Sequence, residues 1–89
     1  MESIIQTEKE CFICGRTEPL HNHHCIEGSY RKASDRYGLC VWLCVEHHMM
    51  AHDNETMMQY LRQTAQRKAM EHYGWSVDDF REHIGRSFL

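Results

Sequence analysis

Cysteine and histidine are concentrated in one part of this chain of 89 residues. All five cysteines and six of the eight histidines lie between residues 11 and 52. Thiolate and imidazole groups are the usual protein ligands of zinc, and small domains are often stabilised by a bound metal. The odd number of cysteines argues against a complete set of disulfides. The sequence therefore predicts that metal sites organise the fold.

Two pairs of residues have the spacing of a structural zinc site. Cys11 and Cys14 are separated by two residues, and so are Cys44 and His47. Each pair can direct two side chains at one ion, and a tetrahedral site needs two such pairs. Cys40 is an alternative to Cys44, because residues four apart in a strand point to the same face. The compact pair with His47 favours Cys44 as the zinc ligand.

The histidines predict a second metal site. His23 and His24 are adjacent in a segment that favours a strand, so their side chains should point to opposite faces. His48 and His52 are four apart in a predicted helix, so they share one face. One strand imidazole and two helix imidazoles can therefore bind a metal, with a further imidazole beside them. His21 lies on the same strand face as His23 and is an alternative ligand.

The order of these residues resembles the HNH endonuclease family. Cys-x-x-Cys comes first, then His-His on a strand, then Cys-x-x-His-His-x-x-x-His at a strand-to-helix junction. The pattern is similar to the small zinc-containing members found in phages and mobile elements. The segment Arg31–Leu39 and the tail Phe80–Leu89 also look like a phage-associated subgroup. The resemblance implies a ββα-metal fold, in which a hairpin leads into a helix.

The resemblance also assigns roles to the histidines. It implies that His24 is the general base and that His23, His48 and His52 are ligands of a catalytic metal. A single Mg²⁺, Mn²⁺, Ni²⁺ or Zn²⁺ is the implied catalytic ion, beside a structural Zn²⁺. Three imidazoles favour a transition metal over Mg²⁺.

The implied activity is that of a metal-dependent DNA endonuclease or nickase, which hydrolyses phosphodiester bonds. DNA is the implied partner, held mostly through its phosphates, and phage packaging or recombination proteins are further partners by family association. Arg31, Lys32 and Arg36 are close together and are predicted to contact phosphates. A solvated helix face is the alternative interpretation of these three cations.

The central asparagine of the family has no match in this chain. Asn22 and Asn54 are in the wrong places, and the segment 37–39 occupies the expected region. The net charge is −3, so this is not a basic protein that coats nucleic acid. Both observations favour an alternative function, a catalytically degenerate HNH-fold adaptor that binds zinc and a nucleic acid or protein.

The hydrophobic pattern predicts one small α+β domain over residues 1–89, with an HNH core at 11–52 and a helical extension at 53–89. Strands are expected at 20–26 and 39–44, because these runs are β-prone and short. Helices are expected at 30–37, with Ser29 as N-cap, at 45–52 and at 55–73. A last helix should begin at a capping box formed by Ser76 and Asp79 and end at Gly85.

The first ten residues are polar with little periodicity, and we expect them to be a loosely attached lead-in. No signal-peptide pattern surrounds Ile4 and Ile5, since charged residues follow at once. No apolar run approaches the roughly 20 residues of a membrane span. The sequence therefore predicts an intracellular protein, phage or prophage encoded, whose cysteines stay reduced.

Overall fold

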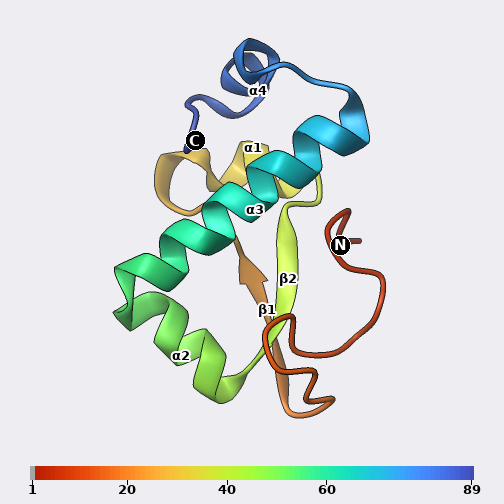
Figure 1. Ribbon diagram of the computed structural model, residues 1–89, viewed down its shortest axis with the longest axis vertical. Coiled ribbons are helices and arrows are strands. Elements are labelled where there is room, and N and C mark those ends of the chain that lie inside the picture. Colours follow the sequence, from red (N-terminus) through yellow and green to blue (C-terminus); the bar gives the residue numbers. More distant parts are fainter. Residues whose placement is uncertain (1) are drawn as a thin grey trace.

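A computed structural model describes residues 2–89 and leaves Met1 outside the described part (Figure 1). The predicted α+β class is confirmed, with a knuckle at residues 11–15 that belongs to a Cys/His cluster able to form a zinc site, a hairpin followed by a helix, and a C-terminal helical extension. The elements are β1 (Leu20–His24), a 3₁₀ turn (Gly28–Tyr30), α1 (Arg31–Arg36), β2 (Cys40–Cys44), α2 (Val45–Asp53), α3 (Glu55–Tyr73) and α4 (Val77–Ile84).

The two strands form an antiparallel sheet that sets the direction of every histidine on β1. Leu20 pairs with Cys44 at one end, and His24 pairs with Cys40 at the other. Side chains alternate between faces along a strand, so His23 and His24 face opposite sides of the hairpin. The first strand ends two residues earlier than expected, because the chain turns away after His24 towards the 3₁₀ turn.

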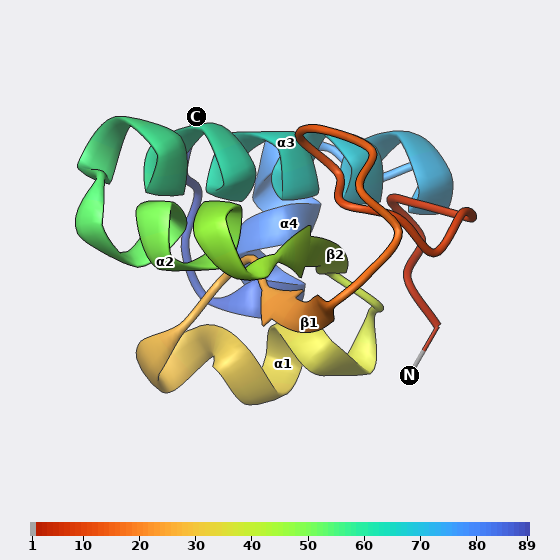
Figure 2. The ribbon, with the colours of Figure 1, turned by 90° about the horizontal axis from the view of Figure 1, so that it is seen from below.

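Helices cover both faces of the hairpin. Helix α1 lies against one face, and α2 and α3 lie on the other (Figure 2). Their apolar side chains meet the strands in one core, which buries more than a dozen residues, among them Ile26, Leu39, Leu43, Leu61 and Phe80. The sheet therefore lies between α1 and the α2–α3 pair. His23 is on the face covered by α2, and His24 is on the face covered by α1.

The helix boundaries follow local chemistry. Asn54 caps α3 by accepting a hydrogen bond from the Met57 backbone N–H at 3.0 Å. The capping box of Ser76 and Asp79 at the start of α4 is confirmed, with both reciprocal bonds formed. The predicted cap by Ser29 is wrong, because the 3₁₀ turn precedes α1 and Tyr30 takes the cap position without a side-chain bond.

The N-terminal segment is bonded to the edge of β2, so the expectation of a loosely attached lead-in is wrong for residues 2–10. The Ser3 hydroxyl donates to the Cys40 carbonyl, and the Ile4 backbone N–H donates to the Gly38 carbonyl at 3.0 Å. The Gln6 side chain accepts from the Trp42 backbone N–H at 2.8 Å. Polar side chains thus substitute for a regular third strand, which is why no hydrophobic period marks this segment.

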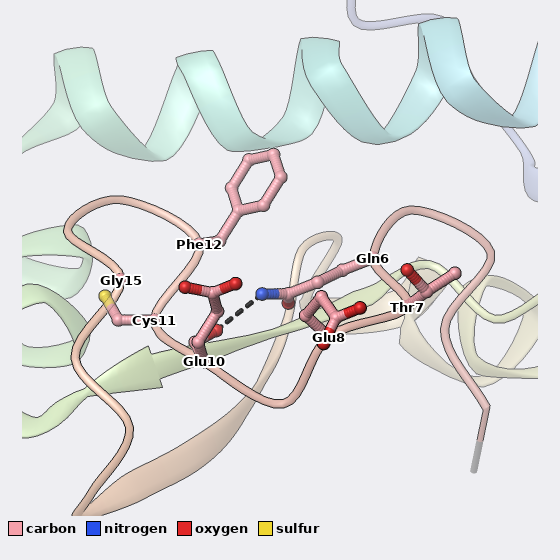
Figure 3. Close-up of a pocket in the computed structure, with 7 residues that line it drawn as sticks. All are labelled: Gln6, Thr7, Glu8, Glu10, Cys11, Phe12 and Gly15. Atoms are coloured by element: carbon pink, nitrogen blue, oxygen red, sulfur yellow. Dashed lines mark hydrogen bonds between the residues drawn. The ribbon is translucent and has the colours of Figure 1, made fainter.

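Gln6 also ties this segment to the zinc knuckle. Its amide donates to the Glu10 carbonyl, across an open hollow between the segment and the knuckle (Figure 3). Phe12 extends from the knuckle towards α3 in the same view and packs against the core. The knuckle is therefore held by the core on one side and by the N-terminal segment on the other.

The C-terminal extension closes the core. Phe88 is buried, and its backbone N–H donates to the Gln66 side chain of α3 at 2.6 Å. Gln66 is itself fully buried and also donates to the Ser87 hydroxyl at 2.9 Å. Among residues 2–89, no helix is long and apolar enough to cross a bilayer.

Candidate metal centres

The four predicted structural ligands meet at one point. The ligand atoms of Cys11, Cys14, Cys44 and His47 all lie within 4.8 Å of one another. The Cys14 and Cys44 sulfurs are 3.9 Å apart, and His47 Nδ1 is 3.2 Å from Cys44 Sγ. Ligands around tetrahedral zinc should be separated by ~3.8 Å for two sulfurs and ~3.6 Å for sulfur and nitrogen. The cluster can therefore hold a zinc ion.

Backbone geometry directs these ligands. The knuckle from Cys11 turns back on itself through a bond from the Gly15 N–H to the Cys11 carbonyl at 2.8 Å, and Gly15 adopts a φ of 80°. Cys44 is the N-cap of α2, so His47 projects from the first turn of the helix towards Cys44. Burial raises the pKa of the Cys11 thiol, but nearby backbone N–H groups outweigh it and lower the pKa to about 6. A thiolate ready to bind metal is the result.

The other two cysteines lie outside this cluster. Cys40 is fully buried at the opposite end of β2 from Cys44, paired across the sheet with His24. Cys25 is buried as well, and burial raises the pKa of its thiol strongly. Of the two alternatives that the sequence allowed for the fourth ligand, the structure brings Cys44 to the site. Cys25 and Cys40 pack as small apolar side chains.

The second predicted cluster also assembles. Ring nitrogens of His23, His48 and His52 lie within 4.8 Å of one another, between β1 and α2. The Nε2 atoms of His48 and His52 are 3.3 Å apart. Two nitrogens on a tetrahedral zinc ion should be separated by ~3.3 Å. The arrangement is therefore compatible with two imidazoles that share one ion.

Outer groups lie beside the Nδ1 atoms of the two helix imidazoles. His21 Nδ1 lies 3.0 Å from Nδ1 of His48, and a Glu27 carboxylate oxygen lies 3.8 Å from Nδ1 of His52. Both helix histidines thus have Nδ1 facing an outer group and Nε2 facing the cluster. Metal-binding histidines typically use their second nitrogen in this way. His21, an alternative ligand by sequence, contacts the cluster through His48.

His23 is the residue whose burial most needs an explanation. Its side chain is fully buried, and neither ring nitrogen has a hydrogen-bond partner among residues 2–89. An unpaired buried polar group is costly, so such groups normally have a partner. Burial, reinforced by the neighbouring His48 and His52, lowers the His23 pKa to about 4. The ring is therefore neutral at physiological pH, the form that binds a metal.

His24 lies outside the cluster, on the face of β1 that looks at α1. Its Nδ1 is 2.7 Å from an Asp35 carboxylate oxygen, and its Nε2 is 3.0 Å from the Arg31 guanidinium. It remains near the cluster, since its charge is among those that lower the pKa values of His23 and His48. The different roles predicted for His23 and His24 thus correspond to different surroundings.

The three predicted phosphate-binding cations are exposed on α1. Arg31, Lys32 and Arg36 all belong to this short helix, and Arg31 also lies 3.6 Å from the Asp35 carboxylate. Their exposure is compatible with both interpretations, phosphate binding and a solvated helix face. Arg31 differs from the other two, because it contacts the His24 ring directly.

The segment 37–39, where the HNH resemblance implies an asparagine, packs against the core. Leu39 is fully buried, and Gly38 adopts a φ of 75° where a Cβ atom would meet the Glu2 carbonyl at 2.6 Å. Asn54 is used as a helix cap. Two acidic residues that the sequence interpretation left out, Glu27 and Asp35, stand beside the histidines instead. No spacing rule links them to the histidines, because the turn after β1 and the packing of α1 bring them there.

A scan against protein-family models found no matching family, and searches of curated proteins and of solved structures found no match either.

Proposed function

We propose that this chain is a metal-dependent DNA endonuclease or nickase of the HNH type. The observation that carries the proposal is the pairing of a three-imidazole cluster with a separate imidazole one residue away. His23 belongs to the cluster, while His24 has polar partners of its own and is partly exposed. A bound metal ion and an adjacent general base are two parts that together can catalyse phosphodiester hydrolysis.

In the proposed reaction His24 removes a proton from the attacking water, because imidazole is the side chain suited to proton transfer near neutral pH. His23, His48 and His52 would hold a divalent ion, which would supply Lewis-acid stabilisation of the phosphate and the departing 3′ oxygen. Arg31, next to His24, holds a phosphate at the base. The cluster of Cys11, Cys14, Cys44 and His47 would hold a structural zinc, which would fix the start of α2 and so orient His48 and His52.

The test is a plasmid-nicking assay with Mg²⁺, Mn²⁺ and Ni²⁺, comparing the wild type with His24→Ala. We expect metal-stimulated nicking by the wild type and a loss of about 10²- to 10⁴-fold in the variant, the usual contribution of a general base. His72→Ala is the matched control, since His72 is exposed at the end of α3 and its ring packs on Tyr73. Absence of metal-stimulated cutting, or equal cutting by His24→Ala, contradicts the enzyme proposal.

The second candidate is a zinc-binding adaptor on the same fold. It is favoured by the net charge of −3 and by the lack of an asparagine in the segment 37–39, where the HNH resemblance implies one. Elemental analysis separates the two candidates independently of cutting. Two ions per chain are expected for the endonuclease, one in each cluster, and one ion per chain for the adaptor.

A further inference from the structure

His24 is held from both sides by α1. The Asp35 carboxylate lies 2.7 Å from Nδ1 of the ring, and the Arg31 guanidinium lies 3.0 Å from Nε2. Arg31 and Asp35 are four apart on the helix, and Arg31 Nε lies 3.6 Å from the second carboxylate oxygen. The three side chains therefore form a closed set in which each contacts the other two.

The chemistry of the partners determines the proton position on His24. A guanidinium only donates hydrogen bonds, so the Nε2 atom that faces Arg31 must be an acceptor and carries no proton. A neutral imidazole has one N–H, which must then be on Nδ1. A carboxylate only accepts when it is ionised, so the Nδ1–H donates to Asp35. The same tautomer satisfies both contacts.

The carboxylate is itself fixed by the fold. Asp35 and the His24 side chain are both largely buried, with exposed fractions of 22% and 24%. The Asp35 backbone carbonyl accepts from the Gly38 N–H at 3.1 Å, and the preceding residue of α1, Ser34, is fully buried. Asp35 therefore lies on the side of α1 that faces β1.

We propose that Asp35 is the positioning residue of His24, which holds the ring as the Nδ1–H tautomer with Nε2 directed outwards as the proton acceptor. The catalytic role of Asp35 rests on the proposed function, whereas the tautomer of His24 does not. Asp35 is then the group that orients the base in a chain that has no asparagine in the segment 37–39, where the HNH resemblance implies one. Arg31 then has a second role, because its guanidinium contacts Nε2 of His24 until a phosphate binds the guanidinium instead.

The first test reads the tautomer without any DNA. Long-range ¹H–¹⁵N spectra of the full-length, zinc-loaded protein at about pH 8, where histidines are ordinarily neutral, report which nitrogen of His24 is protonated. We expect the Nδ1–H tautomer in the wild type and its loss in Asp35→Ala and Asp35→Asn, because both variants also remove the charge that holds the Arg31 guanidinium beside Nε2. In Asp35→Asn, Arg31 is then free to leave Nε2, and an NH₂ group that faces Nδ1 favours the Nε2–H form. An Nε2–H ring in the wild type overturns the proposal, even if both variants fail to fold.

The second test measures nicking by the same proteins. Both Asp35 variants should lower kcat by at least about 10-fold with little change in KM, as is typical of groups that orient a reacting residue. Asp78→Ala is the matched control, because Asp78 is an exposed carboxylate on α4 paired with Arg81. Unchanged zinc content and melting show that the variants are folded. Variants that keep the Nδ1–H tautomer and the wild-type rate overturn the proposal, whereas a wild type that cuts no DNA contradicts only the proposed function.

Discussion

At the scale of single residues, His23 is a buried imidazole without a hydrogen-bond partner in the described part of the chain. Burying such a polar group is energetically unfavourable. The two helix histidines that face it have outer partners on their Nδ1 atoms and direct Nε2 inwards. A bound ion would give the buried ring the partner that no side chain among residues 2–89 supplies. The burial of His23 is therefore compatible with the role of metal ligand proposed for it.

The structural site allows a direct test on one residue. Cys14→Ser removes a thiolate from the cluster, and we expect the variant to lose about one zinc per chain because serine is a poor zinc ligand. The unfolding free energy should fall by about 2 kcal/mol or more, which corresponds to a melting temperature lower by roughly 8–16 °C. Elemental analysis and thermal unfolding monitored by circular dichroism measure the two effects.

Cys25→Ala is the matched control for this prediction. Cys25 is buried like Cys11, but it lies outside the cluster. This variant should keep its zinc while losing some stability from the small cavity. Full zinc content in Cys14→Ser, with unchanged melting, would refute the assignment of Cys14 as a ligand.

Sequence spacing was enough to group the metal ligands, but it did not identify the acidic side chains that contact the histidines. A two-residue gap in a knuckle and a four-residue gap in a helix fix direction locally, so Cys11 with Cys14 and His48 with His52 could be grouped without a fold. The contact between His24 and Asp35 depends on how α1 packs on β1, and no local period encodes that packing. The acidic partners therefore emerge only from the three-dimensional structure.

At the scale of elements, α4 shows how far local chemistry determines a boundary. The Ser76 hydroxyl accepts from the Asp79 N–H at 3.0 Å, and the Asp79 carboxylate accepts from the Ser76 N–H at 2.9 Å. Helix α4 carries Phe80 and Ile84 into the core, so its first turn supports buried packing. We expect Ser76→Ala to lower the unfolding free energy by about 1 kcal/mol, the usual cost of losing an N-cap. Urea denaturation measures it.

The pH dependence of stability in Asp79→Asn is a second test of this cap. Hydrogen bonds from Ser76 lower the pKa of the Asp79 carboxyl below its usual value of 3.8. A carboxyl whose pKa is lower in the folded state stabilises the protein when the pH is above the pKa of the unfolded state. This stabilisation is lost as the pH falls through the pKa of the folded state. The variant should therefore be less stable than the wild type near neutral pH, and the difference should shrink below pH 3.8. A difference that is independent of pH would contradict this account.

The N-terminal segment shows where pattern reading fails at this scale. Its attachment to β2 runs through the Ser3 hydroxyl, the Gln6 amide and backbone groups. Such bonds leave no hydrophobic period, and they form only when β2 offers an unpaired edge. A strand or helix that buries one face can be recognised from sequence, whereas a segment held by polar side chains against an edge cannot.

At the scale of the whole molecule, charge is distributed unevenly around a net value of −3. The exposed cations Lys32 and Arg36 lie on α1, on the same side of the hairpin as His24 (Figure 2). The exposed cations Arg67 and Lys68 lie on α3, which covers the other side. If DNA is bound at His24, only the first pair should contact phosphates.

Salt dependence distinguishes these two faces. Each phosphate neutralised on duplex DNA contributes about −0.9 to the slope of log K against log salt, because counterions are released. Replacing Lys32 and Arg36 by alanine should therefore make the slope shallower by about 2 units, whereas the same change at Arg67 and Lys68 should leave it unaltered. Fluorescence anisotropy with a labelled duplex over a salt series measures both slopes. An equal slope change for the two pairs would show that binding is spread over the surface, and no change for either would mean that α1 is a solvated face.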